Sequence, residues 1–434
     1  MSMHRGPGDH DNGALTRLSR SLEGYSSSHV NAPGPRRPCL SLALFCLASM
    51  GNQMIWITFA SIATRTHETF QVSLMFVNSL SMVFMVAYLP CSFPASRLIA
   101  RQGCRFALLL GVILTTLGAG LRTVVCLEAL GHWPRVILLF AGQTVAAIGQ
   151  PLIVNMPPKL AHDYFPPQTW ALADMIASTA GSVGAAAGSI LSTSLPRIED
   201  ILLVHAAYNA IVLCLCILLF SSDSLRRQEA NLINIADTDV PAGLEVGVLV
   251  MSGRALRHRG FRTLCLAFSC SLGTFNTVST IFEELITPFG FSPADASTCQ
   301  GIVIISGLLG AGVCGLILDC THKYRATLQI SFLLGGASMV LMAVVVPLGP
   351  QMVTWLAVSS AVLGFVLIPV MPTTFEASAA LMSPPFDEAV LSGLCMSGGQ
   401  IIGIAATVCV SLVLKFSVVL ALWLCAMGIV LGAL

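Results

Sequence analysis

The chain contains 434 residues, of which 55% are hydrophobic and only 10% are charged, and its formal net charge is +1. A water-soluble protein with so few charged residues could not cover its surface, whereas lipid accepts apolar side chains directly. The sparse basic residues also argue against a nucleic-acid-binding surface. The composition therefore predicts an all-α membrane protein embedded in the lipid bilayer, with no nucleic acid partner.

The N-terminal part of the chain predicts a tail followed by six membrane-spanning helices. Residues 1–37 are polar, lack the apolar core of a signal peptide and indicate a disordered cytosolic tail. A bilayer-spanning helix needs about 20 apolar residues, and six such stretches follow. They are 38–62, 74–95, 106–126, 134–156, 169–194 and 200–220. These stretches predict an N-terminal six-helix bundle over 38–220.

Residues 221–260 form the only long polar segment inside the chain, and we interpret them as a cytosolic linker. Beyond it, a second set of six apolar stretches predicts a C-terminal bundle over 261–434. They are 261–287, 298–318, 326–347, 351–376, 387–413 and 416–434. The whole chain is thus predicted to form 12 transmembrane helices.

The basic residues predict the orientation of these helices. If the N-terminus is cytosolic, all but five of the 22 Lys and Arg residues lie in the tail, in the linker or in loops on the same side. The five exceptions are Arg65, Arg122, Arg135, Arg197 and Lys415. This is the bias of the positive-inside rule, and it predicts that both termini are cytosolic. The membrane itself, plasma membrane or internal organelle, is left open.

The two predicted bundles carry prolines at corresponding positions. Pro157-Pro158 ends the fourth stretch and Pro372 ends the tenth, and a further proline pair precedes both the fifth and the eleventh. Two six-helix repeats are the arrangement of major facilitator transporters, which work by alternating access. The charged loops after the second and eighth stretches also correspond, and we expect them to contact helix ends and hold the inward-closed state. Their charges are Arg101, Arg105, Asp319, Lys323 and Arg325.

Polar side chains near the centres of apolar stretches are candidate substrate contacts, because they are costly in hydrocarbon. Amides supply both donors and acceptors, and an indole ring attracts cations. Each of these side chains could instead serve helix packing or lipid anchoring. Taken together they favour a polar cavity for a small organic solute. The predicted substrate-binding residues are Gln53, Trp56, Gln150, Phe275, Asn276 and Gln400.

Acidic residues are absent from the centres of the predicted stretches. Glu283 and Glu284 fall near a helix end, and Glu376, one turn beyond Pro372, is the single candidate for ion coupling. We therefore expect facilitated transport rather than proton-coupled pumping. No metal-ligand spacing, nucleotide-binding loop or hydrolase motif is present, so we predict no metal, no cofactor and no enzymatic activity. We also expect a monomer.

Several segments, among them Ile55-Trp56-Ile57, residues 79–88 and Phe375-Glu376, resemble the feline leukaemia virus subgroup C receptor-related family. This family is solute carrier family 49 of the major facilitator superfamily, and the resemblance runs from about Gln53 to about Ile404. It implies transport of choline, ethanolamine or haem, or of pyridoxine in a lysosomal branch. The resemblance also places three residues in the substrate pocket, namely Trp56, Gln150 and Gln400.

The chain departs from the choline-handling members of that family at three places. Asn276 stands where they carry a second aromatic residue, Gly181-Ser182 replaces an Asn-Gln pair, and Ala100 replaces an Asp. These differences leave room for another solute. They also leave a hypothesis from a different class, a non-transporting receptor or sensor on a transporter fold, which would bind its ligand without counterflow.

Overall fold

The computed structural model describes residues 38–126, 131–166, 169–220, 253–321, 323–382 and 388–432, and the regular elements within these ranges are all helices. The predicted tail and most of the predicted linker lie outside the described residues. The described end of the linker, residues 253–257, is helical.

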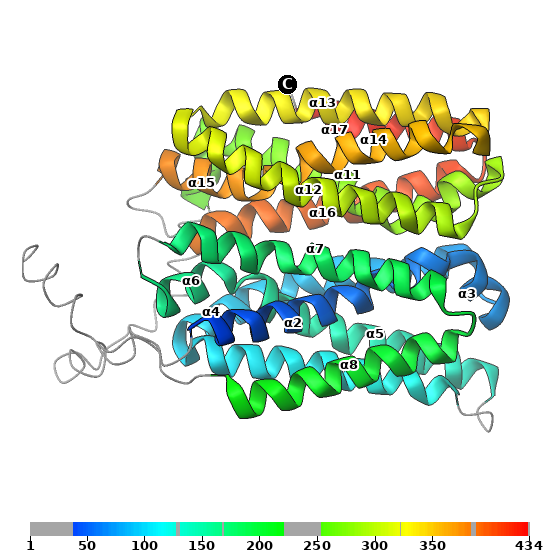
Figure 1. Ribbon diagram of the computed structural model, residues 1–434, viewed down its shortest axis with the longest axis horizontal. Coiled ribbons are helices and arrows are strands. Elements are labelled where there is room, and N and C mark those ends of the chain that lie inside the picture. Colours follow the sequence, from blue (N-terminus) through cyan, green and yellow to red (C-terminus); the bar gives the residue numbers. More distant parts are fainter. Residues whose placement is uncertain are drawn as a thin grey trace, which may run out of the picture.

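The chain folds into two layered bodies, with the N-terminal half below and the C-terminal half above in Figure 1. The first contains α2 (Pro38–Ile57), α3 (Ala63–Phe70), α4 (Leu74–Thr123), α5 (His132–Val154), α6 (Pro157–Tyr164), α7 (Trp170–Ser194) and α8 (Ile198–Leu219). The second contains α11 (Arg259–Ile286), α12 (Pro293–Thr321), α13 (Tyr324–Val345), α14 (Val353–Leu367), α15 (Val370–Met382), α16 (Glu388–Leu414) and α17 (Val418–Leu431).

The described residues contain 11 helices that are long and apolar enough to cross a membrane, and α17 is a shorter apolar helix of 14 residues. The predicted all-α membrane fold is therefore confirmed, with α17 as the twelfth helix. Packing is similar in the two halves, since α2 lies against α7 as α11 lies against α16. Across the interface α7 meets α12, and α16 meets α4.

Three predicted boundaries differ from the structure. The second and third stretches continue into one element, α4, because the loop expected around residues 96–105 is only a kink at Gly103, where φ is 82°. Glycine adopts this conformation without steric cost. The first stretch ends early at Ile57 and continues as the 3-10 turn η1 (Ala60–Ile62) and then α3. The tenth stretch divides into α14 and α15 on either side of Ile368 and Pro369.

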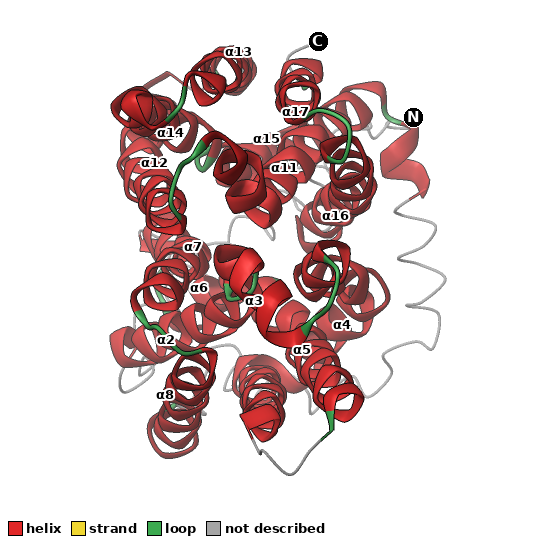
Figure 2. Ribbon diagram, turned by 90° about the vertical axis from the view of Figure 1, so that its right-hand side faces the viewer, coloured by secondary structure: helices red, strands yellow, loops and turns green. Residues whose placement is uncertain are grey.

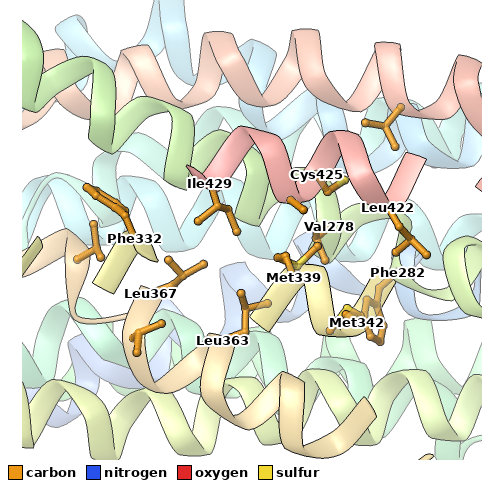
Figure 3. Packing of buried hydrophobic residues seen from close by; sticks show 14 of the residues in the cluster. Val278, Phe282, Phe332, Met339, Met342, Leu363, Leu367, Leu422, Cys425 and Ile429 are labelled. Atoms are coloured by element: carbon orange, nitrogen blue, oxygen red, sulfur yellow. The ribbon is translucent and has the colours of Figure 1, made fainter. Parts of the chain in front are cut away.

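A large apolar core holds the C-terminal half together. Figure 3 shows Phe282 of α11 beside Met342 of α13, with Leu363 and Leu367 of α14 close by. Helices α12 and α14 approach each other closely at Gly364, where an added Cβ would overlap the Val303 carbonyl. Small residues permit this contact between membrane helices.

Candidate functional site

A cavity of about 630 Å³ lies between the two halves. Residues of α2, α4, α5, α6 and α7 line it from the N-terminal half, and residues of α11, α12, α13, α14, α15 and α16 line it from the C-terminal half. All six predicted substrate-binding residues lie on this wall: Gln53, Trp56, Gln150, Phe275, Asn276 and Gln400. The structure thus brings them together, and their contact with a substrate remains a prediction.

Helix α2 contributes Gln53 and Trp56, which are one helical turn apart. The Ser81 hydroxyl of α4 donates to the Trp56 carbonyl at 3.3 Å and ties these helices together. Opposite Gln53, a Cβ added at Gly181 of α7 would lie 3.0 Å from the Gln53 Cγ. The absence of a side chain at Gly181 therefore gives the Gln53 side chain its space in the cavity wall.

Asn276 and Gln400 face each other from α11 and α16. The Asn276 amide donates to Gln400 Oε1 at 3.3 Å, and both residues are more than 90% buried. Beside them, the Thr277 hydroxyl donates to the Gly403 carbonyl at 3.3 Å. The pair uses one acceptor and one donor, so Asn276 Oδ1 and the Gln400 amide hydrogens remain available for a polar solute.

Gln150 of α5 is buried, and its Oε1 has no hydrogen-bond partner among the residues that the structure describes. The next residue, Pro151, has no N–H, so the helix lacks one backbone hydrogen bond there. An unpartnered buried oxygen costs about 1–3 kcal/mol. A water molecule or a solute donor in the cavity would remove this cost.

Sequence reasoning missed several residues of the wall. The Tyr88 hydroxyl of α4 donates to Asn155 Oδ1 at 2.8 Å, and the Asn155 amide donates to the Ser96 hydroxyl at 3.1 Å. Gln300 of α12 accepts from the Ser189 hydroxyl at 2.9 Å. Tyr88 ends the segment that carries the family resemblance, and Asn155 precedes the proline pair, so the sequence could have indicated both as wall residues. No such indication existed for Gln300, because it lies near the beginning of a predicted stretch.

The described wall is almost uncharged. Lys159 is its one charged residue among those that the structure describes, and its Nζ pairs with Asp163 Oδ2 at 3.3 Å. A cationic solute would therefore meet aromatic rings and amide oxygens rather than a carboxylate. The aromatic residues of the wall include Trp56, Tyr88 and Phe275.

The cavity has two unlike ends. The basic end carries Lys159 of α6, and α6 and α15 lie there, at the left of Figure 1. Arg101 lies two residues beyond Ile99 of the wall, and Lys323 follows the end of α12, so both belong to the same end. The gate end, at the right, carries α3. Hydrogen bonds join the described parts of the two halves from the level of Gln300 toward the gate end. Among them are Ala63 to Glu283 (2.6 Å), Asn78 to Ser411 (3.3 Å), Ser189 to Gln300 (2.9 Å) and Thr193 with Ser297 (2.8 Å).

Comparison with known proteins identifies the family. The model of the Major Facilitator Superfamily matches residues 41–407. Solute carrier family 49 member A3 of Xenopus tropicalis is 31% identical, and the match covers 85% of this chain and 76% of that protein. The chain belongs to solute carrier family 49 of the Major Facilitator Superfamily. The resemblance seen in the sequence is therefore confirmed.

The chain is also similar to other transporters and to solved structures. The choline/ethanolamine transporter flvcr2a of Danio rerio is 26% identical, with 86% of this chain and 80% of that protein covered. A POT family transporter in complex with 5-aminolevulinic acid has a TM-score of 0.66 at 17% identity, covering 92% of this chain and 95% of its own. That likeness shows the facilitator fold alone.

The charged residues predicted to act in gating or coupling lie outside the described wall of the cavity. Arg101, Lys323 and Arg325 are exposed and Arg105 is half-buried, while the Asp319 side chain lies outside the described part. The role of these loop charges in holding an inward-closed state therefore stays a prediction. The candidate for coupling, Glu376, is likewise exposed, whereas Glu283 is 1% exposed.

Arg122 is completely buried in α4, although we counted it among the charges at the outer ends of helices. Its guanidinium carbon lies 4.9 Å from the centroid of the Phe59 ring, and none of its nitrogens has a hydrogen-bond partner within the described residues. Next to Phe59, Thr58 contacts His205 of α8 at 3.2 Å. These contacts lie at the break between α2 and α3, which begins after Ile57.

Proposed function

We propose that this facilitator transports a small organic solute, choline- or ethanolamine-like, by facilitated alternating access. The observation that carries the proposal is the convergence of Trp56, Gln150, Asn276 and Gln400 on one cavity wall between the two halves. The relatives named choline/ethanolamine transporters support the substrate class. The described wall contains no histidine to ligate haem iron.

The chemistry of the wall suits an amine that carries a hydroxyl group. Attraction of a desolvated cation to an aromatic face is worth about 2 kcal/mol, and Trp56 offers such a face. The partnerless Oε1 of Gln150 and the remaining donors of Gln400 complement the hydroxyl group. Because the wall lacks a described carboxylate, binding of a permanent cation depends on these rings and amide dipoles.

The two ends of the cavity correspond to an inward-facing state in this proposal. The cavity includes Ile99 and Lys159 of the basic end, whereas hydrogen bonds join the halves toward the gate end. The positive-inside rule assigns the basic end to the cytosol. Both termini are then cytosolic, and the gate end faces the opposite compartment.

Thermal-shift measurements on the purified protein identify the solute, because a ligand of the folded state raises the unfolding temperature. The panel contains choline, ethanolamine, pyridoxine, haem and amino acids. Uptake of the stabilising compound into proteoliposomes then tests transport. We expect Gln150→Ala and Gln400→Ala each to raise the solute concentration for half-maximal uptake about tenfold, because each removes a buried hydrogen bond to the solute.

Gln102→Ala is the matched control, since Gln102 is exposed at the kink of α4. Unchanged transport in both Gln150→Ala and Gln400→Ala would refute the site. Binding without counterflow would refute transport and favour a receptor or sensor.

A further inference from the structure

The eight-residue helix α3 begins without a side-chain cap of its own. Its N-cap residue, Ile62, has φ −136° and ψ 41°, and its side chain makes no capping hydrogen bond to the first turn. The first backbone N–H groups of a helix have no partner within the helix. An isolated helix of this length is also marginally stable. The beginning of α3 therefore needs an acceptor from elsewhere.

Glu283 of the other half supplies that acceptor. Its Oε2 accepts from the Ala63 backbone N–H at 2.6 Å, across the interface between the bundles. Glu283 is 1% exposed, and Ala63 is buried as well. A carboxylate at a helix N-terminus is favoured both by the hydrogen bond and by the helix dipole. In Figure 2, which looks onto the gate end, α3 lies on the midline beside α11.

The position of Glu283 links this contact to the cavity. Asn276 and Glu283 are seven residues apart on α11, so they lie on one face of the helix and about 10 Å apart along its axis. On the N-terminal side, Trp56 and Ala63 are separated by the same number of residues across the break after α2. A movement of α11 relative to α2 therefore acts on the cavity and on the cap together.

We infer that Glu283 caps α3 across the interface and holds the gate end closed, and that opening of the gate uncaps α3. This inference rests on the proposed alternating access. The other carboxylate oxygen, Oε1, has no partner within the described part of the chain. Since this oxygen gains hydration when the halves separate, the closed contact is reversible.

Hydrogen exchange measured by mass spectrometry tests the cap without requiring transport. In Glu283→Gln the amide oxygen remains but the charge is lost, and we expect exchange in peptides covering residues 58–70 to accelerate about tenfold. Glu283→Asp keeps the charge and should show a smaller acceleration. Glu68→Gln is the matched control, because Glu68 is an exposed carboxylate on α3 itself.

Unchanged exchange of this segment in a folded Glu283→Gln protein would overturn the inference, as would equal acceleration in Glu68→Gln. A melting curve establishes that each variant is folded. Failure of the proposed transport is seen separately, as absence of uptake by the unsubstituted protein, and it leaves the exchange result on the cap interpretable.

Discussion

The two ends of the cavity are held by different kinds of contact. At the gate end, a backbone N–H of α3 and side chains of α4 and α7 form hydrogen bonds with α11, α16 and α12 of the other half. At the basic end, the hydrogen bonds of Tyr88 with Asn155 and of Asn155 with Ser96 stay within the N-terminal half. Bonds between the halves must break when they separate, whereas bonds within one half can move with it as a rigid body.

This difference indicates which contacts determine the free energy of exchange between the open and closed states. A closed gate end stabilised by several small polar contacts and one buried carboxylate can be opened at moderate cost, because each neutral hydrogen bond contributes only about 0.5–1.5 kcal/mol net. A change in the gate contacts should therefore shift the balance between states. A change at the basic end should alter the stability of one half and leave that balance less affected.

A disulfide across the gate end should have the largest effect. The hydroxyls of Thr193 and Ser297 lie 2.8 Å apart on α7 and α12, so cysteine sulfur atoms at these positions need only a small shift to reach the S–S bond length of about 2.0 Å. We expect Thr193→Cys with Ser297→Cys, once oxidised, to abolish uptake into proteoliposomes, because the halves can no longer part. Reduction should restore it.

The two single cysteine variants are the controls for this experiment, since the chain has 15 native cysteines. Formation of the bond is measured by intact mass. Full uptake by the cross-linked protein would show that α7 and α12 need not separate at this level during transport.

Loss of a bond at the basic end should have a smaller effect. Tyr88→Phe removes the hydroxyl that donates to Asn155 between α4 and α5. We expect the free energy of unfolding to fall by about 1 kcal/mol, measured as a lower thermal transition, with hydrogen exchange in α3 unchanged. Accelerated exchange in α3 would contradict the separation of the two ends.

Much of the fold was predictable because it follows from hydrophobic length. The apolar stretches predicted twelve helices, and the family resemblance predicted their arrangement. The break after Ile57 was not predictable, because Thr58 and Phe59 continue an apolar pattern. There the Thr58 hydroxyl bonds to the Met54 carbonyl at 2.7 Å and contacts His205 of a distant helix, and such tertiary contacts leave no local signal.

The polar wall was predictable because amides in apolar stretches are conspicuous, whereas the role of Glu283 was not. Near a helix end, a carboxylate is normally solvated, so its position in the sequence suggested no function. The structure buries Glu283 because the end of α11 abuts the beginning of α3 in the other half. Contacts between distant segments cannot be predicted when each apolar stretch is analysed separately.

The loop charges at the basic end should affect transport without affecting the stability of this state. Arg101 and Lys323 are exposed here, so Arg101→Gln with Lys323→Gln should change the free energy of unfolding by less than about 0.5 kcal/mol. If these charges hold the inward-closed state, uptake should nevertheless slow. Parallel melting and uptake measurements distinguish these effects, and unchanged uptake would remove the loops from the mechanism.

Substitution of Glu376 should have the smallest effect on transport. The residue is exposed on α15 and lies outside the described wall of the cavity, so Glu376→Gln should leave the solute contacts of the wall unchanged. Exposed charges contribute about 0–1 kcal/mol to their interactions, and we expect uptake to remain within about twofold of that of the unsubstituted protein. Uptake measured across a range of pH is the decisive assay. A pH dependence that is present in the unsubstituted protein and absent from Glu376→Gln would make this carboxylate a coupling site and refute facilitated transport. Glu199→Gln is the control, because Glu199 is a partly exposed carboxylate at the beginning of α8 in the other half, where it lies 3.9 Å from Arg197.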